Sequence, residues 1–275
     1  MKSNEEKADC KKLSPEEKSI ASTLRQVFQN FHFQPSVALA SDHTAKSFIS
    51  GWDAFFFNNI LLEGPSDPEN LISEIKHIHG SLKKPLMIWT TPETIQDKEA
   101  RLTKSLESAF STHGAFFGML LDLSHVNFSA DLSPDITIEA VHDEQSSTEF
   151  SKILCHVFQM RLIEDKMAQW ALQQTRTSSP GAINYVAKCH GVPAGVSSLF
   201  LNSPLKTGGL YNAAVLPEYR KSGVGTAMAE HRAQVAHSMG LETLSIILMS
   251  DAMALGYCER MGFKKICEFT PYFVG

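Results

Sequence analysis

The residues best able to do chemistry gather between Arg220 and Gly225, where the sequence reads RKSGVG. They follow an apolar stretch ending at Val215 and precede a helical pattern, so we expect a strand, a loop and a helix in that order. The first N–H groups of a helix have no partner within it and carry partial positive charge. Gly223 and Gly225 permit positive φ angles and close approach of a ligand to the backbone. Such a loop can bind a phosphate or pyrophosphate group, with Arg220 and Lys221 adding charge at its rim.

The same glycines could also form a tight strand–helix connection that binds nothing, and both interpretations stay open for the loop taken alone. Two other nucleotide-binding loops are disfavoured. A Walker A loop needs four residues between its glycines and then Gly-Lys-Ser/Thr, which is absent. The dinucleotide fingerprint needs a third small residue at position 228, where the chain has Met228.

Helices and strands are expected to alternate along the chain, which is the pattern of an α/β protein. Ser14, Pro15 and Glu17 supply a cap, a first-turn proline and a capping box for a first helix. In the first half we expect helices at 14–30, 67–82 and 97–111 and strands at 52–62, 85–90 and 115–123. In the second half we expect strands at 136–141, 183–189, 194–201, 208–215, 241–249 and 263–269, with helices at 144–158, 163–174, 225–239 and 252–260.

A polar stretch at residues 124–135 contains a Ser-Pro step and is predicted to be a linker. It divides the chain into a first domain at 14–132 and a second at 133–275, after a solvated tail at 1–13.

Composition excludes several classes of function. The 275 residues include 25 Lys and Arg against 30 Asp and Glu, and neither half has the basic excess of a nucleic-acid binder. No apolar run reaches the roughly 18 residues of a membrane span, and the first ten residues lack the apolar core of a secretory signal. Five cysteines without a Cys-x-x-Cys pair favour a reducing cytoplasm. Eleven histidines show no zinc-ligand spacing, so no metal site is expected.

The form Arg-x-x-Gly-x-Gly after Val-x-Pro-Glu-Tyr resembles motif A of the GNAT superfamily, the acyl-CoA-dependent N-acyltransferases. Three further segments agree with this resemblance. Residues 185–201 resemble the family's central hairpin, and Gly208–Val215 looks like its fourth strand, which splays from the fifth to admit pantetheine. The sequence CERMGF at 258–263 is similar to the family's Tyr-x-x-x-Gly-Phe segment. The resemblance covers about residues 135–273 and implies a mixed α/β sheet flanked by helices.

The first half resembles the degenerate GNAT-like domain that precedes the active one in a bacterial branch of the family. The matching segments are WDAFFFNNILL, Pro85–Trp89 and GMLLDL. Because the first half has no Arg/Gln-x-x-Gly-x-Gly loop, we expect no CoA site in it. The implied architecture is an internal pseudo-dimer, with a monomer and a homodimer both left open.

The resemblance also implies where acetyl-CoA binds. Its pyrophosphate would lie on the backbone N–H groups of the loop, and backbone near Ala213 and Val215 would line the pantetheine and polarise the thioester carbonyl. An amine attacks that carbonyl directly, so the protein supplies position and electrostatics rather than a covalent nucleophile. The implied donor-site residues are Ala213, Val215, Arg220, Lys221, Ser222, Gly223, Val224, Gly225 and Thr226.

The general acid is a point of departure from the family pattern. Many relatives protonate the thiolate with a tyrosine at the position that Cys258 occupies here, and Tyr257 is one residue earlier, about 100° away on a helix. Three alternatives stay open: a shifted helix start that lets Tyr257 serve, Cys258 as a weaker donor, or no side-chain acid. Cys258 could also be a packing residue, which free cysteine usually is.

No base is assigned, and a water-mediated base or an amine that arrives neutral is preferred. Glu218 could be a solvated carboxylate at the helix entry, while His231 and His237 lie on the helix after the loop.

The expected function is transfer of an acetyl group from acetyl-CoA to an amine of a small molecule or peptide. The alternatives are a non-catalytic CoA-binding sensor or interaction protein, and a binder of another nucleotide phosphate. The acceptor pocket is expected between the helices around Phe158–Trp170, the first domain and the segment 271–273, although core packing explains those aromatic residues equally well.

Overall fold

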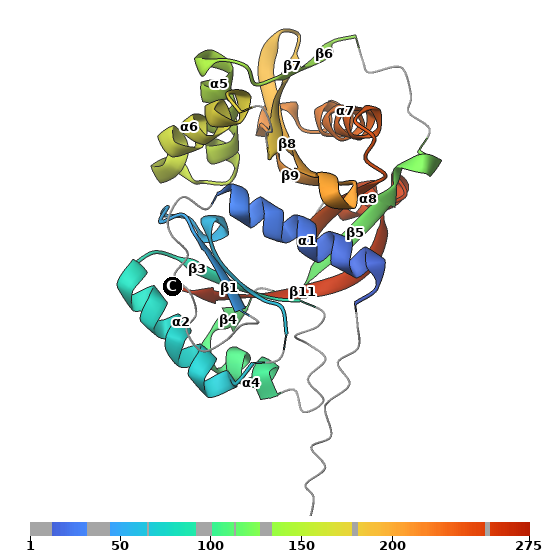
Figure 1. Ribbon diagram of the computed structural model, residues 1–275. Helices are drawn as coiled ribbons and strands as arrows, with labels where there is room; N and C mark the ends of the chain where they lie inside the picture. Colours follow the sequence, from blue (N-terminus) through green and yellow to red (C-terminus); the bar gives the residue numbers. More distant parts are fainter. Residues whose placement is uncertain are drawn as a thin grey trace, which may run out of the picture.

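The computed structural model describes residues 13–31, 45–64, 66–91, 101–112, 114–126, 134–177, 181–250 and 254–275. Figure 1 shows helices on both faces of a large twisted sheet. The helices are α1 (Pro15–Asn30), α2 (Pro68–Leu82), α4 (Arg101–Ala109), α5 (Glu144–Val157), α6 (Glu164–Thr175), α7 (Val224–Ser238) and α8 (Leu255–Arg260). The strands are β1 (Ala45–Ile49), β2 (Asn58–Leu62), β3 (Leu86–Thr90), β4 (Ser111–Thr112), β5 (Phe116–Asp122), β6 (Ile136–Ala140), β7 (Ala182–Cys189), β8 (Val192–Asn202), β9 (Thr207–Val215), β10 (Thr243–Met249) and β11 (Lys264–Val274).

One continuous path of strands joins the two halves of the chain, in the order β1-β2-β3-β11-β5-β10-β9-β8-β7-β6. Strand β5 of the first half lies between β10 and β11 and is antiparallel to both. The end of β11 in turn pairs with β3, with Tyr272 opposite Ile88. The boundary expected at 132–133 lies outside the described residues, and strands from both sides of it share this sheet.

Helix α1 forms where the sequence predicts it and holds the shared sheet from one face. The Ser14 N–H donates to Glu17 Oε2 at 2.8 Å, and the Glu17 N–H donates to Ser14 Oγ at 3.1 Å, which completes the expected capping box. Ile20, Leu24 and Val27 are buried at helical spacing. The helix packs across β8, β9 and β5, so the first half contributes to the core of the second.

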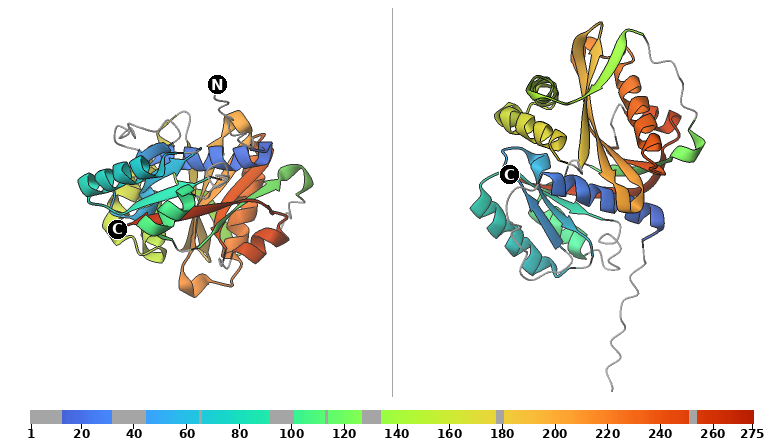
Figure 2. Two further views of the ribbon diagram at one scale, coloured as in Figure 1. Left: turned by 90° about the horizontal axis from the view of Figure 1, so that it is seen from below. Right: turned by 45° about the horizontal axis from the view of Figure 1, so that its top comes forward.

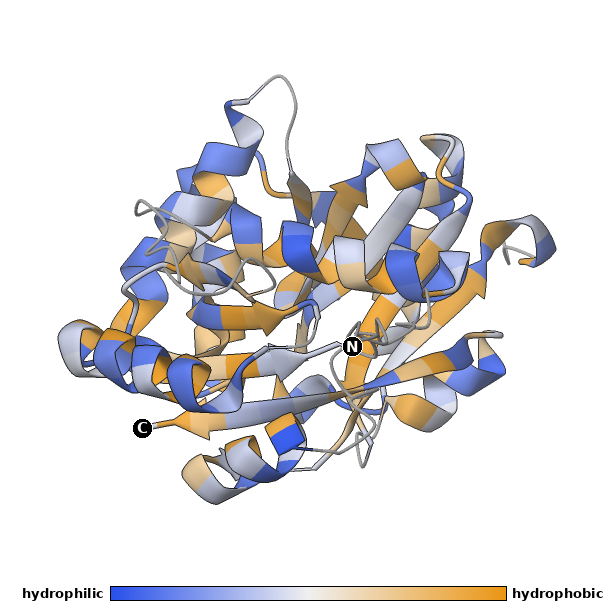
Figure 3. Ribbon diagram, turned by 60° about the horizontal axis from the view of Figure 1, so that its bottom comes forward, coloured by the Kyte–Doolittle hydropathy of each residue, from blue (hydrophilic) through white to orange (hydrophobic). Residues whose placement is uncertain are grey.

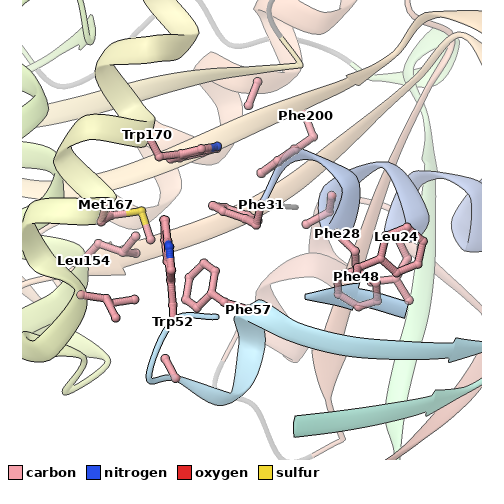
Figure 4. Packing of buried hydrophobic residues seen from close by; sticks show 14 of the residues in the cluster. Leu24, Phe28, Phe31, Phe48, Trp52, Phe57, Leu154, Met167, Trp170 and Phe200 are labelled. Atoms are coloured by element: carbon pink, nitrogen blue, oxygen red, sulfur yellow. The ribbon is translucent and has the colours of Figure 1, made fainter. Parts of the chain in front are cut away.

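An aromatic cluster fills the space between α1, α6 and the sheet (Figure 4). The Phe31 ring lies 4.4 Å from the Trp170 ring and 4.8 Å from the Phe57 ring, measured between centroids. The Trp170 indole N–H donates to the carbonyl of Asn30 at 3.1 Å. Figure 3 shows hydrophobic residues along the central strands and mixed faces on the helices, as expected for elements that cover a sheet.

The strand expected at 52–62 is wrong in its first part, where Phe55–Phe57 forms a 3₁₀ turn and only Asn58–Leu62 is extended. The buried side chain of Asn58 explains the turn. Its amide donates to the carbonyls of Trp52 and Pro85 at 2.8 and 2.9 Å, and its oxygen accepts from the Gly51 N–H at 2.9 Å. These hydrogen bonds satisfy backbone groups that have no partner in a neighbouring strand.

Other differences concern element ends. Strand β1 was not expected from the sequence, and β11 continues to Val274 rather than ending at 269 because its last residues pair with β3. Helix α4 ends at Ala109, and Ser111 lies in the short strand β4. The helix starts expected at 97 and 252 lie outside the described residues.

Candidate functional site

Strands β9 and β10 separate after a short paired region. They are parallel and pair only from Thr207 to Gly209 on β9, although β9 continues to Val215 and β10 to Met249. Hydroxyl groups close the paired end, where Thr207 Oγ1 lies 2.6 Å from Ser19 Oγ and 2.8 Å from Thr243 Oγ1. The opposite end is open, which leaves backbone groups of β9 without partners from β10 and available to an extended ligand.

A β-bulge accompanies this separation. Asn212 and Ala213 together lie opposite Ser197 of β8, and Asn212 has a φ angle of 55°. The Asn212 amide donates to Ser198 Oγ at 3.0 Å, which holds the bulged residue in place. A bulge bends its strand and increases the local twist, so it directs the end of β9 away from β10.

Arg232 of α7 ties the bulge to the helix that follows the loop. Arg232 is 3% exposed, and its guanidinium donates to the carbonyls of Met228 at 3.1 Å, Ser198 at 3.0 Å and Tyr211 at 3.4 Å. Desolvation lowers the pKa of Arg232 to about 10, which still leaves it cationic at neutral pH. Ser198 and Tyr211 are paired across β8 and β9 immediately beside the bulge. Arg232 therefore fixes the bulged strand relative to the N-terminus of α7.

The loop between β9 and α7 presents an unpaired helix N-terminus to solvent. Lys221 and Gly223 have φ angles of 66° and 88°, so the chain reverses sharply before Val224. The first helical bond is donated by the Ala227 N–H to the carbonyl of Gly223, at 2.9 Å. Because the N-cap residue is a glycine, no side chain caps the preceding N–H groups. The N–H groups of residues 223–226 consequently have no partner among the described residues and form an anion-binding end.

The space beside Gly225 is open in the protein itself. A Cβ atom at this position would have Val215 Cγ2, at 3.8 Å, as its nearest neighbour, an ordinary van der Waals distance. Internal packing therefore does not require a glycine there. A ligand that lies directly on the backbone would require one.

The predicted donor-site residues come together at one end of β9. Ala213, Arg220, Lys221, Ser222, Gly223, Gly225 and Thr226 are exposed, Val215 is partly buried, and Val224 is fully buried and anchors the first turn of α7. Ser222 Oγ donates to the carbonyl of Tyr219 at 2.6 Å, so this hydroxyl stabilises the loop.

Tyr257 and Cys258 lie on α8 in different surroundings. The Tyr257 hydroxyl is 3.4 Å from the carbonyl oxygen of Thr226, in the first turn of α7. The Cys258 thiol lies in an apolar cluster and the residue is 4% exposed. Burial raises the pKa of Tyr257 to about 12 and that of Cys258 to about 11. Both groups are protonated at neutral pH, and Tyr257 is the one beside the loop.

The other candidate residues lie in three different surroundings. Glu218 is exposed in the turn Pro217–Tyr219. The His231 ring packs edge-on against Tyr185, with centroids 5.0 Å apart, and burial lowers the pKa of His231. His237 is exposed in the last turn of α7.

Of the aromatic residues expected near an acceptor pocket, some are buried in the core and one is exposed on the surface. Trp170 is 1% exposed and Tyr272 is fully buried, so both serve the core, whereas Phe158 is 46% exposed.

The bulge at Asn212 and the role of Arg232 were missed in the sequence. Arg232 did carry a signal, because it follows Met228 by four residues on the apolar face of a helical pattern. An arginine there must find internal acceptors for its N–H groups.

The described part of the chain shows neither a set of metal ligands nor a membrane-spanning helix. No three His, Cys, Asp or Glu side chains gather there as a set of metal ligands. None of its helices has the length and apolar character needed to cross a bilayer.

Comparisons with known proteins agree with this geometry. Residues 140–263 match the model of the acetyltransferase (GNAT) family. The uncharacterized N-acetyltransferase CgeE of Bacillus subtilis (strain 168) is 27% identical over 81 residues, or 30% of this chain. The match spans about a third of that relative's own length, 31%.

Solved structures share the fold along nearly the whole chain. A GCN5-related N-acetyltransferase from Kribbella flavida has a TM-score of 0.66 at 11% identity, covering 92% of this chain and 95% of its own. A tandem GNAT protein from the clavulanic acid biosynthesis pathway has a TM-score of 0.54 at 11% identity, covering 92% and 94%. The fold is therefore the GNAT fold, and the predicted mixed α/β sheet flanked by helices is confirmed.

Proposed function

We propose that the protein transfers an acetyl group from acetyl-CoA to an amine of a small molecule or peptide. One observation carries the proposal: an uncapped helix N-terminus lies at the open end of two diverging strands. The helix N-terminus can bind the pyrophosphate of acetyl-CoA, and the space between the diverging strands can hold its extended pantetheine arm. The family match over residues 140–263 supports the same reaction.

The donor would bind along the end of β9. Its pyrophosphate would accept hydrogen bonds from the N–H groups that follow Lys221, with the side chains of Arg220 and Lys221 adding positive charge. The unpaired backbone near Ala213 and Val215 would bind the pantetheine amides and place the thioester carbonyl beside the bulge. Arg232 holds α7 and the bulged strand in fixed relative positions, because it donates hydrogen bonds to the carbonyl of Met228 in α7 and to that of Tyr211 beside the bulge.

The reaction requires the amine and the thioester to be held close together and the negative charge that develops on the carbonyl oxygen to be stabilised. The amine nitrogen forms a bond to the thioester carbon while the carbonyl electrons move to oxygen. When that oxyanion collapses, the carbon–sulfur bond breaks and the sulfur leaves as a thiolate. The nitrogen loses a proton, to water or before binding, and the thiolate gains one. We assign Tyr257 rather than Cys258 as the proton donor, because Tyr257 is only partly buried whereas Cys258 is buried.

We further propose one donor site for the whole chain. The tandem neighbour supports a division into GNAT-like domains at 14–132 and 133–275, and only the second contains the Arg-x-x-Gly-x-Gly loop. Four free, buried cysteines among the described residues suit a reducing cytoplasm.

A turnover assay tests the proposed reaction. Acetyl-CoA is incubated with the protein and a panel of primary amines and amino-terminal peptides, and the free CoA thiol is followed together with the mass of the acetylated product. We expect amine-dependent release of CoA with an equal amount of product. Tight acetyl-CoA binding without turnover on any amine would instead identify a CoA-binding sensor.

Replacing Tyr257 by Phe is expected to lower kcat by about 100-fold, the usual contribution of a positioned general acid. The KM for acetyl-CoA should change little, because the hydroxyl is not expected to bind the donor. Cys258→Ala is the matched variant one residue away and should retain kcat. Equal kcat values for wild type and Tyr257→Phe, measured at saturating acetyl-CoA, would remove the acid role from Tyr257.

A further inference from the structure

A cavity of about 560 Å³ opens beside the last turn of α5 and shares only Arg220 with the donor site described above. One wall comes from the end of α5 and the turn that follows it, including His156, Arg161 and Leu162. The other wall is the segment that follows β9, with Pro217 and Arg220. The cavity therefore reaches the same end of β9 as the candidate donor site.

The charges around this cavity have one sign. Arg161 and Arg220 contribute guanidinium groups and His156 an imidazole, and none of the described residues that line the cavity carries a carboxylate. Glu164 and Glu218, the acidic residues nearest to the two arginines in the sequence, are not among the lining residues.

The side chains of Arg161, Arg220 and His156 also lack partners. Within the described part of the chain, no ion pair or side-chain hydrogen bond joins Arg161, Arg220 or His156 to another residue. Elsewhere on the surface, lysines are paired with carboxylates at 2.6 to 2.8 Å, as in Lys46–Glu63, Lys84–Asp53, Lys188–Glu139 and Lys206–Glu242. The side chains of Arg161 and Arg220 therefore have no partner among the described residues and line a cavity that a ligand could reach.

The cavity beside α5 and the N-terminus of α7 lie on different sides of the strands between them. Helix α5 packs with Val196, Phe200 and Ala214 on one face of the sheet, whereas α7 packs against Ala187, Ala194 and Val215 on the other. Figure 2 shows α5 and α7 separated by strands β7 to β9. A donor held at the start of α7 and a second ligand held beside α5 would meet at the open end of β9.

We propose that this cavity binds an anionic group, a carboxylate or a phosphate, on the amine acceptor. The inference rests on the proposed transferase function and specifies the substrate class of that site. An amine arrives largely as an ammonium ion, which the unpaired cations repel, so an acceptor needs a compensating negative charge to bind there. Arg161 can bind such a group in two-pronged geometry, because a guanidinium matches the oxygens of carboxylate and phosphate. Leu162, which is 80% exposed, offers an apolar contact to the rest of the acceptor.

The test uses inorganic phosphate and acetate as probes and protein already saturated with CoA, so that the loop is filled. We expect one of the two anions to bind and its Kd to rise at least tenfold in Arg161→Ala, with partial recovery in Arg161→Lys. Lys166→Ala is the matched control, because Lys166 is an exposed cation on the neighbouring helix that does not line the cavity. The anion that binds identifies the chemistry of the acceptor group.

Three results would overturn the proposal in distinguishable ways. If CoA binds but neither anion responds to Arg161→Ala, the cavity has no anion site and the transferase function still stands. If Arg161→Ala weakens binding of CoA but not of 3′-dephospho-CoA, the cavity holds a donor phosphate. If CoA itself does not bind to the wild-type protein, the proposed function fails and this inference fails with it.

Discussion

Replacing Gly225 by Trp is expected to raise the Kd for acetyl-CoA by at least about 100-fold, equivalent to roughly 2.7 kcal/mol of binding free energy. An indole at this position would cover the N–H groups at the start of α7, where the pyrophosphate is proposed to lie. Gly225 is exposed, and an added Cβ would meet no close contact, since its nearest atom is Val215 Cγ2 at 3.8 Å. We therefore expect the melting temperature to stay within about 2 °C of wild type.

A matched control separates this effect from the general effect of adding an indole. Gly80, in α2 of the first half, also has open space around an added Cβ atom. Gly80→Trp should retain wild-type affinity, and Gly225→Ala should give an intermediate loss. Unchanged affinity in Gly225→Trp, measured by calorimetry, would show that acetyl-CoA does not use the loop.

The second large effect concerns stability, and we expect Phe31→Ala to lower the free energy of unfolding by about 3 to 5 kcal/mol. Phe31 is 4% exposed, and its ring contacts Trp52 and Phe57 of the first half and Trp170 and Phe200 of the second. Truncation would leave a cavity between the halves that rigid aromatic neighbours cannot fill. The loss in the free energy of unfolding is measured by urea unfolding, monitored by tryptophan fluorescence and by circular dichroism.

Phe56→Ala is the control for that measurement, because Phe56 is 47% exposed and its loss should cost under about 1 kcal/mol. The two optical probes should give coincident transitions, since strands of both halves lie in one sheet. Two separate transitions in the wild-type protein, or a loss for Phe31→Ala equal to that of Phe56→Ala, would contradict a common core.

Local signals in the sequence were sufficient for the loop and for most elements. Glycine spacing located the turn before α7, and the Ser14–Glu17 pair located the start of α1, because both depend on residues within one turn of each other. The sequence could not reveal that β5 lies between β10 and β11. That pairing joins residues more than 100 positions apart, and an apolar strand carries no mark of its partner.

The candidate site was predictable in its backbone and less so in its side chains. The N–H groups of the loop follow from the strand–loop–helix order alone. The geometry at Tyr257 and Cys258 depends on how α8 packs against α7, which one-residue spacing does not determine. The bulge at Asn212 was equally hidden, because an extra residue in one strand is visible only against the partner strand.

The most direct test is a calorimetric titration of acetyl-CoA into the wild-type protein. We predict a single site per chain with micromolar affinity, about −8 kcal/mol, since only the second half contains the Arg-x-x-Gly-x-Gly sequence. Two sites per chain would mean that the first half also binds the donor. An absence of binding would contradict the acyltransferase proposal and leave the loop as a structural connection between β9 and α7.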